Sequence, residues 1–278
     1  YIMDSAERAG GTLACAFFYI TREGIERSKE WEKLYGGKVG KNDPTVYGRD
    51  WYLDANNRKI SVRHYDPYDY LVKDVAVAQT HNVSVNGKSG KTTFNIGLGY
   101  LDQDGMNKAA KEDNFKRYNA SINLTTEFNK WITLKAGAIY SKREKSYPYN
   151  ATGVFDPWYY CYRWSDIYPM GTDENGNELR SPASEFSQAN TAKMTRNYTN
   201  INMGLHLNIL KGWTADFDYS HANQEYIWLR PGTRFTAADT WGGATPRLDA
   251  NGNRVTVNYY GQDMPAHDLA MSTYTGVG

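Results

Sequence analysis

One pattern constrains the fold of this chain more than any other: two adjacent stretches in which apolar and polar residues alternate one by one. Across residues 118–128 the even positions are apolar or threonine, and the odd positions are polar or charged. The alternation resumes over residues 132–140. Strict alternation is typical of β-strands with one apolar face, and the short gap between the stretches predicts a tight hairpin.

The lengths of these two strands suggest a membrane. Each is about as long as a transmembrane β-strand must be, roughly 9–11 residues. Aromatic residues lie where each strand would leave the hydrocarbon layer, and no apolar run reaches the roughly 18 residues that a membrane-spanning helix requires. We interpret the hairpin as part of an outer-membrane barrel.

Four more stretches show the same alternation, at residues 81–87, 94–100, 201–209 and 213–220. Their apolar positions and those of the hairpin should form one lipid-facing surface, whose predicted members are Phe94, Ile96, Leu98, Ile122, Leu124, Leu134, Leu205, Leu207 and Phe217. The opposite face carries small residues that allow close approach of neighbouring chain, and polar ones such as Lys135, His206, Asp216 and Asp218, which we interpret as a solvated lumen wall.

The connections between the strands alternate in length. Those at 88–90, 129–130 and 211–212 are short, whereas those at 102–115, 142–197 and from 223 onward are long. An up-and-down outer-membrane barrel has short periplasmic turns and long extracellular loops. Two aromatic girdles are consistent with this arrangement, with Phe128, Trp131 and Trp213 near the short turns and Tyr100, Tyr118, Tyr140, Tyr198 and Tyr219 near the long loops.

The predicted fold class is therefore all-β: an antiparallel up-and-down transmembrane β-barrel, partial, with about six strands, long extracellular loops and one short helix. Residues 1–78 form an extracellular loop region with that helix, which begins after Thr21 and stops at Gly36-Gly37. Residues 79–222 hold the strands, with a large extracellular loop at 142–197, and residues 223–278 form a further extracellular loop. Six strands leave open edges in lipid, so the rest of the barrel must come from chain not included here or from other subunits. We expect an internal fragment of a larger protein, the alternative being a mature processed domain.

Composition narrows the possible functions. The chain has 32 Lys and Arg against 31 Asp and Glu, which removes any general argument for a nucleic-acid partner. A mean hydropathy of −0.71 together with 23 Tyr and 8 Trp suits a barrel, because half of each strand faces water.

The long loops hold the densest candidate site, a group of aromatic side chains interleaved with charged residues. Such rings stack on sugars, anchor a partner protein, or pack the loop against itself, and all three interpretations stay open. The predicted contact residues are Tyr147, Tyr149, Trp158, Tyr159, Tyr160, Tyr162, Trp164, Tyr168, Trp228 and Trp241.

Catalytic and metal sites find little support. The five histidines show no paired ligand spacing, no nucleophile or phosphate motif occurs, and we expect neither an enzyme, a cofactor nor a metal site. Stretches 53–57, 173–177 and 248–253 resemble the start of a calcium loop, but the last two lack its twelfth-position Glu, and their Asn-Gly pairs favour tight turns. Cys15 and Cys161 are either a disulfide or two separate thiols.

Several motifs occur in the order found in one transporter family. The segment His81-Asn82-Val83-Ser84-Val85-Asn86-Gly87 is followed by Gly99-Tyr100-Leu101-Asp102-Gln103-Asp104-Gly105 and then by Phe115-Lys116-Arg117-Tyr118-Asn119. This order resembles the start of the barrel in SusC-like (RagA-like) TonB-dependent transporters of Bacteroidetes, in which HNLSVSGG precedes GYLNQEG and F-x-R-Y-N. The resemblance is clear over about residues 42–145, although Asn86 and Lys88 replace the usual small residues.

The resemblance implies active import of an oligosaccharide or oligopeptide across the outer membrane, beneath a SusD-like surface lipoprotein, with coupling to TonB through regions that this chain does not include. The alternative is a secreted or surface-attached carbohydrate-binding or adhesin β-domain without transport activity. In an adhesin the apolar row would be buried against a second sheet, whereas in a barrel it faces lipid.

Overall fold

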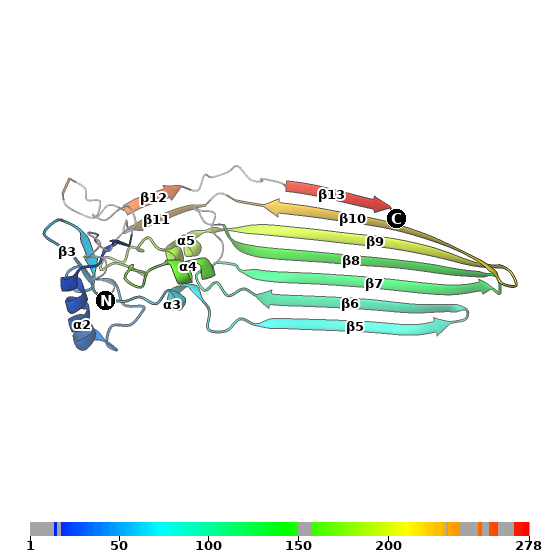
Figure 1. Ribbon diagram of the computed structural model, residues 1–278, viewed down its shortest axis with the longest axis horizontal. Helices are drawn as coiled ribbons and strands as arrows, with labels where there is room; N and C mark the ends of the chain where they lie inside the picture. The colour runs from blue at the N-terminus through cyan, green and yellow to red at the C-terminus, as the bar shows by residue number, and fades with distance from the viewer. Residues whose placement is uncertain are drawn as a thin grey trace.

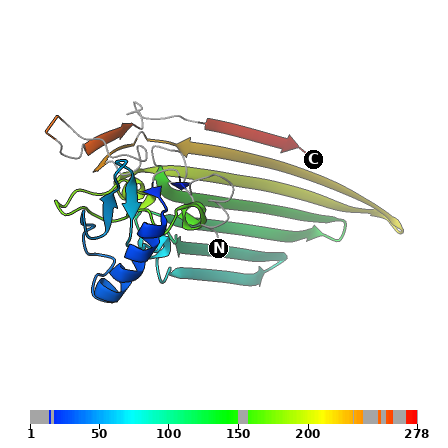
Figure 2. The ribbon, with the colours of Figure 1, turned by 60° about the vertical axis from the view of Figure 1, so that its left-hand side comes forward.

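The computed structural model describes residues 14–15, 18–149, 157–231, 233–238, 250–251, 256–260 and 270–277. They form two parts, a long antiparallel sheet and a compact body at one end of its strands (Figure 1). The short turns lie at the far end of the sheet, away from this body (Figure 2). Among the described residues, no helix is long and apolar enough to cross a membrane.

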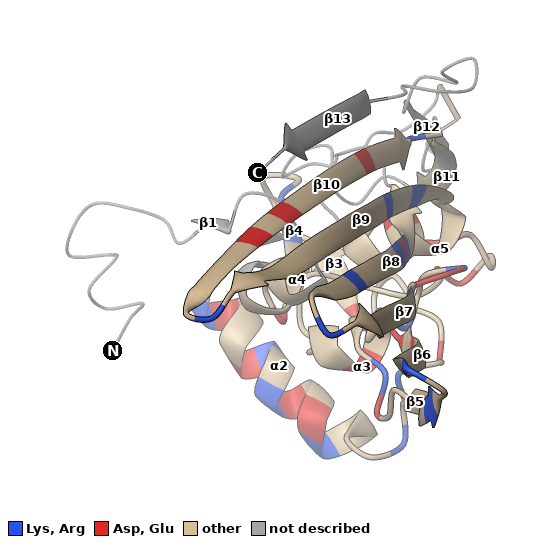
Figure 3. Ribbon diagram, turned by 90° about the vertical axis from the view of Figure 1, so that its right-hand side faces the viewer, with Lys and Arg blue, Asp and Glu red and all other residues tan. Residues whose placement is uncertain are grey.

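The sheet has seven strands in the order β13-β10-β9-β8-β7-β6-β5. Every neighbouring pair is antiparallel, and from β5 to β10 each strand pairs with the next one along the chain. The sheet is curved and open, with β5 and β13 at its edges (Figure 3). The prediction of an all-β, antiparallel, partial up-and-down arrangement is confirmed. The strands are β5 (Ala78–Ser89), β6 (Thr92–Asp104), β7 (Asn114–Asn129), β8 (Ile132–Tyr149), β9 (Asn190–Leu210), β10 (Trp213–Leu229) and β13 (Ala270–Val277).

The three short turns form where the sequence predicts them. Gly90 (φ 59°) and Gly212 (φ 85°) take the left-handed conformation that glycine tolerates best, which reverses the chain between β5 and β6 and between β9 and β10. Between β7 and β8, the side-chain oxygen of Asn129 accepts hydrogen bonds from the backbone N–H groups of Trp131 and Ile132 at 2.8 and 2.9 Å. This Asn turn closes the hairpin locally.

The strands are longer than predicted. β8 has 18 residues and β9 has 21, so both take in residues assigned above to the loop 142–197. β6 and β7 likewise shorten the connection at 102–115, and the region from 223 onward contains the end of β10, β13, and the pair β11 (Arg234–Ala238) and β12 (Thr256–Tyr260). The added segments carry polar residues on both faces. They therefore lack the alternation that predicts a strand. Their extended conformation is instead supported by backbone pairing with the neighbouring strands.

The compact body combines segments that are distant in sequence. We call it the loop domain (residues 19–74, 106–113 and 157–189). It holds α2 (Arg22–Tyr35), α3 (Pro67–Leu71), α4 (Pro157–Arg163), α5 (Pro182–Gln188), β3 (Trp51–Leu53) and β4 (Lys59–Ser61), with β1 (Ala14–Cys15) and β2 (Phe18–Tyr19) extending its small sheet. The prediction of one helix is thus too low. The other three helices, α3, α4 and α5, have only 5, 7 and 7 residues, which is too short for a helical period to be visible in the sequence.

One hydrophobic core fills the loop domain. Trp51, Tyr65 and Leu71 come from the first segment, while Trp164 and Phe186 come from the last. Each is at most 7% exposed. The apolar side chains of residues 51–72 are therefore covered by residues more than 80 positions later.

The predicted helix is present as α2. At its start, the Thr21 side chain accepts a hydrogen bond from the N–H of Gly24 at 3.0 Å. At its end, the N–H of Gly36 donates a hydrogen bond to the Glu32 carbonyl at 2.9 Å. Trp31 is buried on its inner face. The capping residues read from the sequence therefore mark its true ends.

Candidate functional site

The outer face of the sheet is one continuous apolar surface. Directly paired residues of an antiparallel sheet lie on the same face. Ile96 pairs with Ile122, Ile122 with Ala138, and Ala138 with Ile201, which joins β6, β7, β8 and β9 through apolar partners. β10 extends the surface, because its Phe217 pairs with Leu205.

The side chains of this surface are uncovered. In the described part of the chain no second sheet packs on it, and none of the nine residues predicted to face lipid is buried. Four are exposed by 38–62%: Ile96, Leu98, Leu134 and Phe217. Five are half-buried beside their neighbours: Phe94, Ile122, Leu124, Leu205 and Leu207.

Aromatic side chains border the apolar surface at both ends. Phe128, Trp131 and Trp213 are 54–69% exposed near the short turns. Toward the loop domain, Tyr100 contacts Tyr118 with ring centres 5.1 Å apart, and Tyr140 and Tyr219 are also exposed. The assignment of Tyr198 to this girdle is wrong. It pairs with Ser141 on the inner face, because it has the opposite parity to Ile201.

The inner face is polar, and asparagine dominates it. One rung runs across five strands through Asn86, Asn95, Asn123, Gly137 and Asn202. A Cβ at Gly137 would overlap the side chains of Asn123 and Asn202, so these amides lie over the glycine. The small residues expected on this face therefore make room for neighbouring polar side chains.

Charged residues join this wall nearer the short turns. His206 and Asp216 are cross-strand partners, with Nδ1 and Oδ1 2.7 Å apart. The Asp218 carboxylate and the Lys135 side chain lie beside Gly204. This part of the inner face is therefore a polar wall with a cross-strand hydrogen bond.

The predicted contact aromatics divide into buried and exposed groups. Tyr147, Tyr160, Trp164 and Tyr168 are 5–7% exposed and pack inside, while Tyr149, Tyr159 and Trp228 are half-buried. Trp228 donates from Nε1 to the Tyr147 hydroxyl at 2.6 Å. Trp158 and Tyr162 on α4 are 45% and 73% exposed, and Trp241 lies outside the described residues. Among the described members of this group, Trp158 and Tyr162 therefore have the most exposed side chains.

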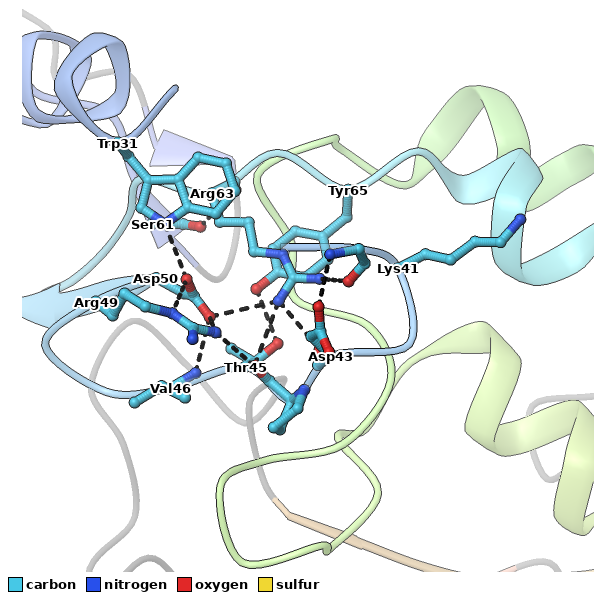
Figure 4. Close-up of polar contacts among 12 residues, drawn as sticks. Trp31, Lys41, Asp43, Thr45, Val46, Arg49, Asp50, Ser61, Arg63 and Tyr65 are labelled. Atoms are coloured by element: carbon cyan, nitrogen blue, oxygen red, sulfur yellow. Dashed lines mark hydrogen bonds and ion pairs between the residues drawn. The ribbon is translucent and has the colours of Figure 1, made fainter. Parts of the chain in front are cut away.

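A buried ion cluster holds the loop domain together, and the sequence did not reveal it (Figure 4). The Asp50 carboxylate is fully buried and accepts from Trp31 Nε1 at 2.9 Å, from Arg49 at 2.8 and 2.9 Å, and from the Val46 N–H at 2.9 Å. Arg63 is 3% exposed and lies 3.4 Å from the same carboxylate. Burial alone would raise the pKa of Asp50, but the hydrogen bonds from Arg49, Val46 and Trp31 outweigh it and hold this pKa below its usual value.

A second polar group links α2 to the chain before Tyr168. His64 lies 2.9 Å from Ser28 Oγ through Nε2 and 3.2 Å from Asp166 through Nδ1. Ser28 donates its hydroxyl proton to the Val62 carbonyl at 2.8 Å. That proton is therefore not directed at His64, as a serine nucleophile would require. The group borders two clefts of about 500 and 400 Å³ and acts as a structural link.

Two of the three calcium-like stretches are turns, as predicted. Asp54 Oδ1 accepts from the N–H groups of Asn56 and Arg58, and Asp173 Oδ1 accepts from those of Asn175 and Asn177, all at 2.8–2.9 Å. Within the described ranges, no group of three His, Cys, Asp or Glu side chains is placed to hold a metal. The third stretch, 248–253, lies almost wholly outside those ranges, and so does the side chain of Cys15, so both alternatives for Cys15 and Cys161, a disulfide or two separate thiols, stay untested.

Comparison with known proteins finds a similar receptor for part of the chain. A segment of 83 residues is 40% identical to the TonB-dependent receptor SusC of Bacteroides thetaiotaomicron. The chain is similar to a TonB-dependent receptor. The match covers 30% of this chain and 8% of that receptor, so the chain spans a small part of the length of this relative.

A solved structure, that of the RagAB peptide transporter, aligns with 63% of this chain and 22% of its own, at 17% identity and a TM-score of 0.38. No family model matches the chain. SusC is described as a receptor and not as an enzyme, in agreement with the prediction that this chain is not an enzyme.

Proposed function

We propose that this chain is one arc of the barrel of a TonB-dependent importer in the bacterial outer membrane, and that the importer carries an oligosaccharide or oligopeptide. The observation that carries the proposal is the apolar surface that runs uncovered across β6 to β10, with a polar face opposite. Exposing so large an apolar surface to water would cost free energy. In a bilayer the same side chains would contact lipid tails, which are also apolar. The SusC match supports the same class of protein.

Strand length agrees with this placement. A strand of 21 residues is about 70 Å long, and a tilt of roughly 45° leaves it about 50 Å tall, well beyond a hydrocarbon layer of about 30 Å. The ends near the loop domain then project from the membrane, which agrees with their charged residues. The loop domain lies outside the cell in this orientation.

The open edges at β5 and β13 require further strands, because unpaired backbone groups are costly in lipid. We expect them from regions that this chain does not include, together with the contacts to TonB. A SusD-like lipoprotein is the expected partner on the extracellular side, where Trp158 and Tyr162 are exposed. The adhesin alternative is less favoured, because nothing in the described residues covers the apolar row.

Two adjacent substitutions on β7 test the proposal. Leu124→Arg puts a charge on the apolar face and should cost about 2–4 kcal/mol near the bilayer midplane, so assembled protein in the outer-membrane fraction should fall. Asn123→Arg puts the same charge on the inner face of the same strand and should assemble normally. Equal membrane yields of both variants would contradict the assignment of the lipid face. Recovery of the unmodified full-length protein in a soluble fraction without detergent would contradict the proposed function itself.

A further inference from the structure

The strand register brings three arginines into one row on the inner face. Arg117 on β7 pairs directly with Arg143 on β8, and Arg143 pairs directly with Arg196 on β9. Directly opposed side chains in antiparallel strands have Cβ atoms about 4.5–5.5 Å apart, and like charges in this position destabilise a sheet. An anion bound among these three adjacent cations would relieve their mutual repulsion.

The described residues around the row do not provide one. Its other members are Thr80, Leu101, Tyr226 and Ser272. Next to the arginines, the rung on the loop-domain side contains Phe115, Lys145, Met194 and Trp228, and the rung on the other side contains Asn119, Ser141, Tyr198 and Gln224. None of these is acidic, and Lys145 adds a fourth cation. None of the three arginines forms an ion pair with any residue in the described part of the chain.

The outer face at the same height is different. There Lys116 lies 3.8 Å from Asp102, and Lys142 lies 2.8 Å from Glu144. Cations that point outward on β7 and β8 thus have carboxylate partners, whereas those one residue away that point inward have none. Figure 3 marks basic residues on β8 and β9 toward the loop domain. The imbalance belongs to the inner face and not to the strands as a whole.

The guanidinium groups are positioned and accessible. Arg196 lies over the Tyr226 ring at 5.1 Å, and Arg117 Nε lies 3.2 Å from the terminal side-chain amide of Asn119, which can turn its oxygen toward it. Arg143 and Arg196 are exposed and Arg117 is half-buried. Each guanidinium keeps N–H donors that match a carboxylate or sulfate in a bidentate manner.

The rest of the inner face favours a sugar as the carrier of this anion. Asparagine and serine present both donors and acceptors, as sugar hydroxyls require, and they are the commonest residues in the rungs between the arginine row and the charged residues near the short turns. Tyr198 is 37% exposed one rung from Arg196, where its ring offers a surface for stacking.

We propose that Arg117, Arg143 and Arg196 bind the carboxylate or sulfate groups of an acidic oligosaccharide on its way along the inner wall. This inference rests on the proposed function, because it takes the polar face as the wall of a transport path. The row is then a selectivity element near the entrance, at which electrostatic attraction concentrates anionic solute.

The chain provides a matched control. The variant Arg117→Gln/Arg143→Gln/Arg196→Gln removes three charges from the inner face, and Lys116→Gln/Lys142→Gln/Lys193→Gln removes three from the outer face of the same strands. Binding would be measured on full-length protein in detergent, with a galacturonic acid hexasaccharide, a neutral hexasaccharide and hexaglutamate as probes. The unmodified protein and the lysine variant should prefer the acidic sugar, with affinity that falls as salt rises. The arginine variant should bind it at least tenfold more weakly and bind the neutral sugar unchanged.

Several results would overturn the inference. They are no preference for the acidic sugar in the unmodified protein, an equal loss in the lysine variant, or binding of hexaglutamate as tight as that of the acidic sugar. The single variant Arg143→Gln should raise thermal stability by relieving repulsion, and a lower stability would mean that the row already pairs with acidic residues of the same protein.

All variants are first checked for outer-membrane assembly. Failure of the unmodified protein to assemble there contradicts the proposed function, whereas normal assembly without discrimination contradicts only the role of the arginines.

Discussion

Asp50 shows how a buried charge can organise a domain without an apolar pattern. Its carboxylate accepts hydrogen bonds from Trp31 on α2 and from the backbone at Val46, and it forms ion pairs with Arg49 and Arg63. Removing one partner of such a buried pair leaves the other charge uncompensated, which costs more than the pair contributes when intact. The geometry of the loop around Asp50 therefore depends on this one ionised side chain.

Asp50→Asn should destabilise the loop domain by about 3–5 kcal/mol, because Arg63 stays buried at 3% exposure without its anion. Amide hydrogen exchange of residues 45–72 in the full-length protein would report the loss. Glu23→Gln, which breaks the exposed pair with Arg27, should change protection by less than about 1 kcal/mol. Similar losses of amide protection in the two variants would contradict the conclusion that burial makes the Asp50 ion pairs more important for stability than the exposed Glu23–Arg27 pair.

The lowered pKa of Asp50 also predicts a pH dependence. A carboxyl whose pKa is lower in the folded state stabilises the fold above its unfolded pKa of about 3.9, and this contribution is lost as pH falls through the folded value. Protection of the loop domain should therefore decline below about pH 4 in the unmodified protein. In Asp50→Asn this part of the acid sensitivity should be missing when exchange is followed over the same pH range.

At the scale of elements, the position of α2 depends on a glycine. Gly24 is buried in the first turn, and a Cβ there would lie 2.8 Å from Ile60 Cγ2 on β4 and 3.1 Å from Thr21 Oγ1. Glycine weakens a helix by roughly 1 kcal/mol relative to alanine. Close packing of α2 on β4 compensates for this cost, and two turns later Trp31 fixes the same helix to Asp50 through its Nε1 hydrogen bond.

Gly24→Leu should therefore destabilise the loop domain by roughly 1–3 kcal/mol, even though leucine is the better helix former. Glu26→Leu places the same side chain on the exposed face of α2 and should leave stability nearly unchanged. Thermal unfolding of the two full-length variants, followed by fluorescence of the tryptophans, would compare them. A stabilised Gly24→Leu variant would mean that α2 does not pack on β4 as described.

At the scale of the whole molecule, two segments about 100 residues apart share one hydrophobic core. Tyr160 on α4 meets Phe186 on α5 edge to face at 5.9 Å, and both belong to the core that holds Trp51, Tyr65 and Leu71. The backbone N–H of Tyr65 also donates to the Asp166 carbonyl at 2.7 Å. The two segments should therefore open and close together.

Phe186→Ala should cost about 3–5 kcal/mol, because the side chain is fully buried in this shared core. Hydrogen exchange should then speed up at residues 51–72 as well as at 160–186, while the strands keep their protection. Tyr162→Ala, at a side chain 73% exposed, is the control and should alter neither segment. Loss confined to residues 160–186 would show that the two segments fold independently.

The sequence by itself determined the features that depend on neighbouring residues. Alternation around Ile122 and Leu124 separated the two faces of the sheet, Asn129 and Gly212 marked turns, and Thr21 marked the start of α2. These features are local, because side-chain direction, turn geometry and helix capping each involve only a few consecutive residues.

The tertiary structure decided what depends on pairing between distant segments. Arg117, Arg143 and Arg196 are on three different strands and are far apart in the sequence. Only the register of β7, β8 and β9 places them in one row. Only packing buries Tyr160 and Trp164 beside Trp51, where the sequence shows a run of aromatics open to several uses. The physical reason is the same in both cases: long-range contacts are selected by the total free energy of the folded chain, and no local pattern encodes which partner a residue will meet.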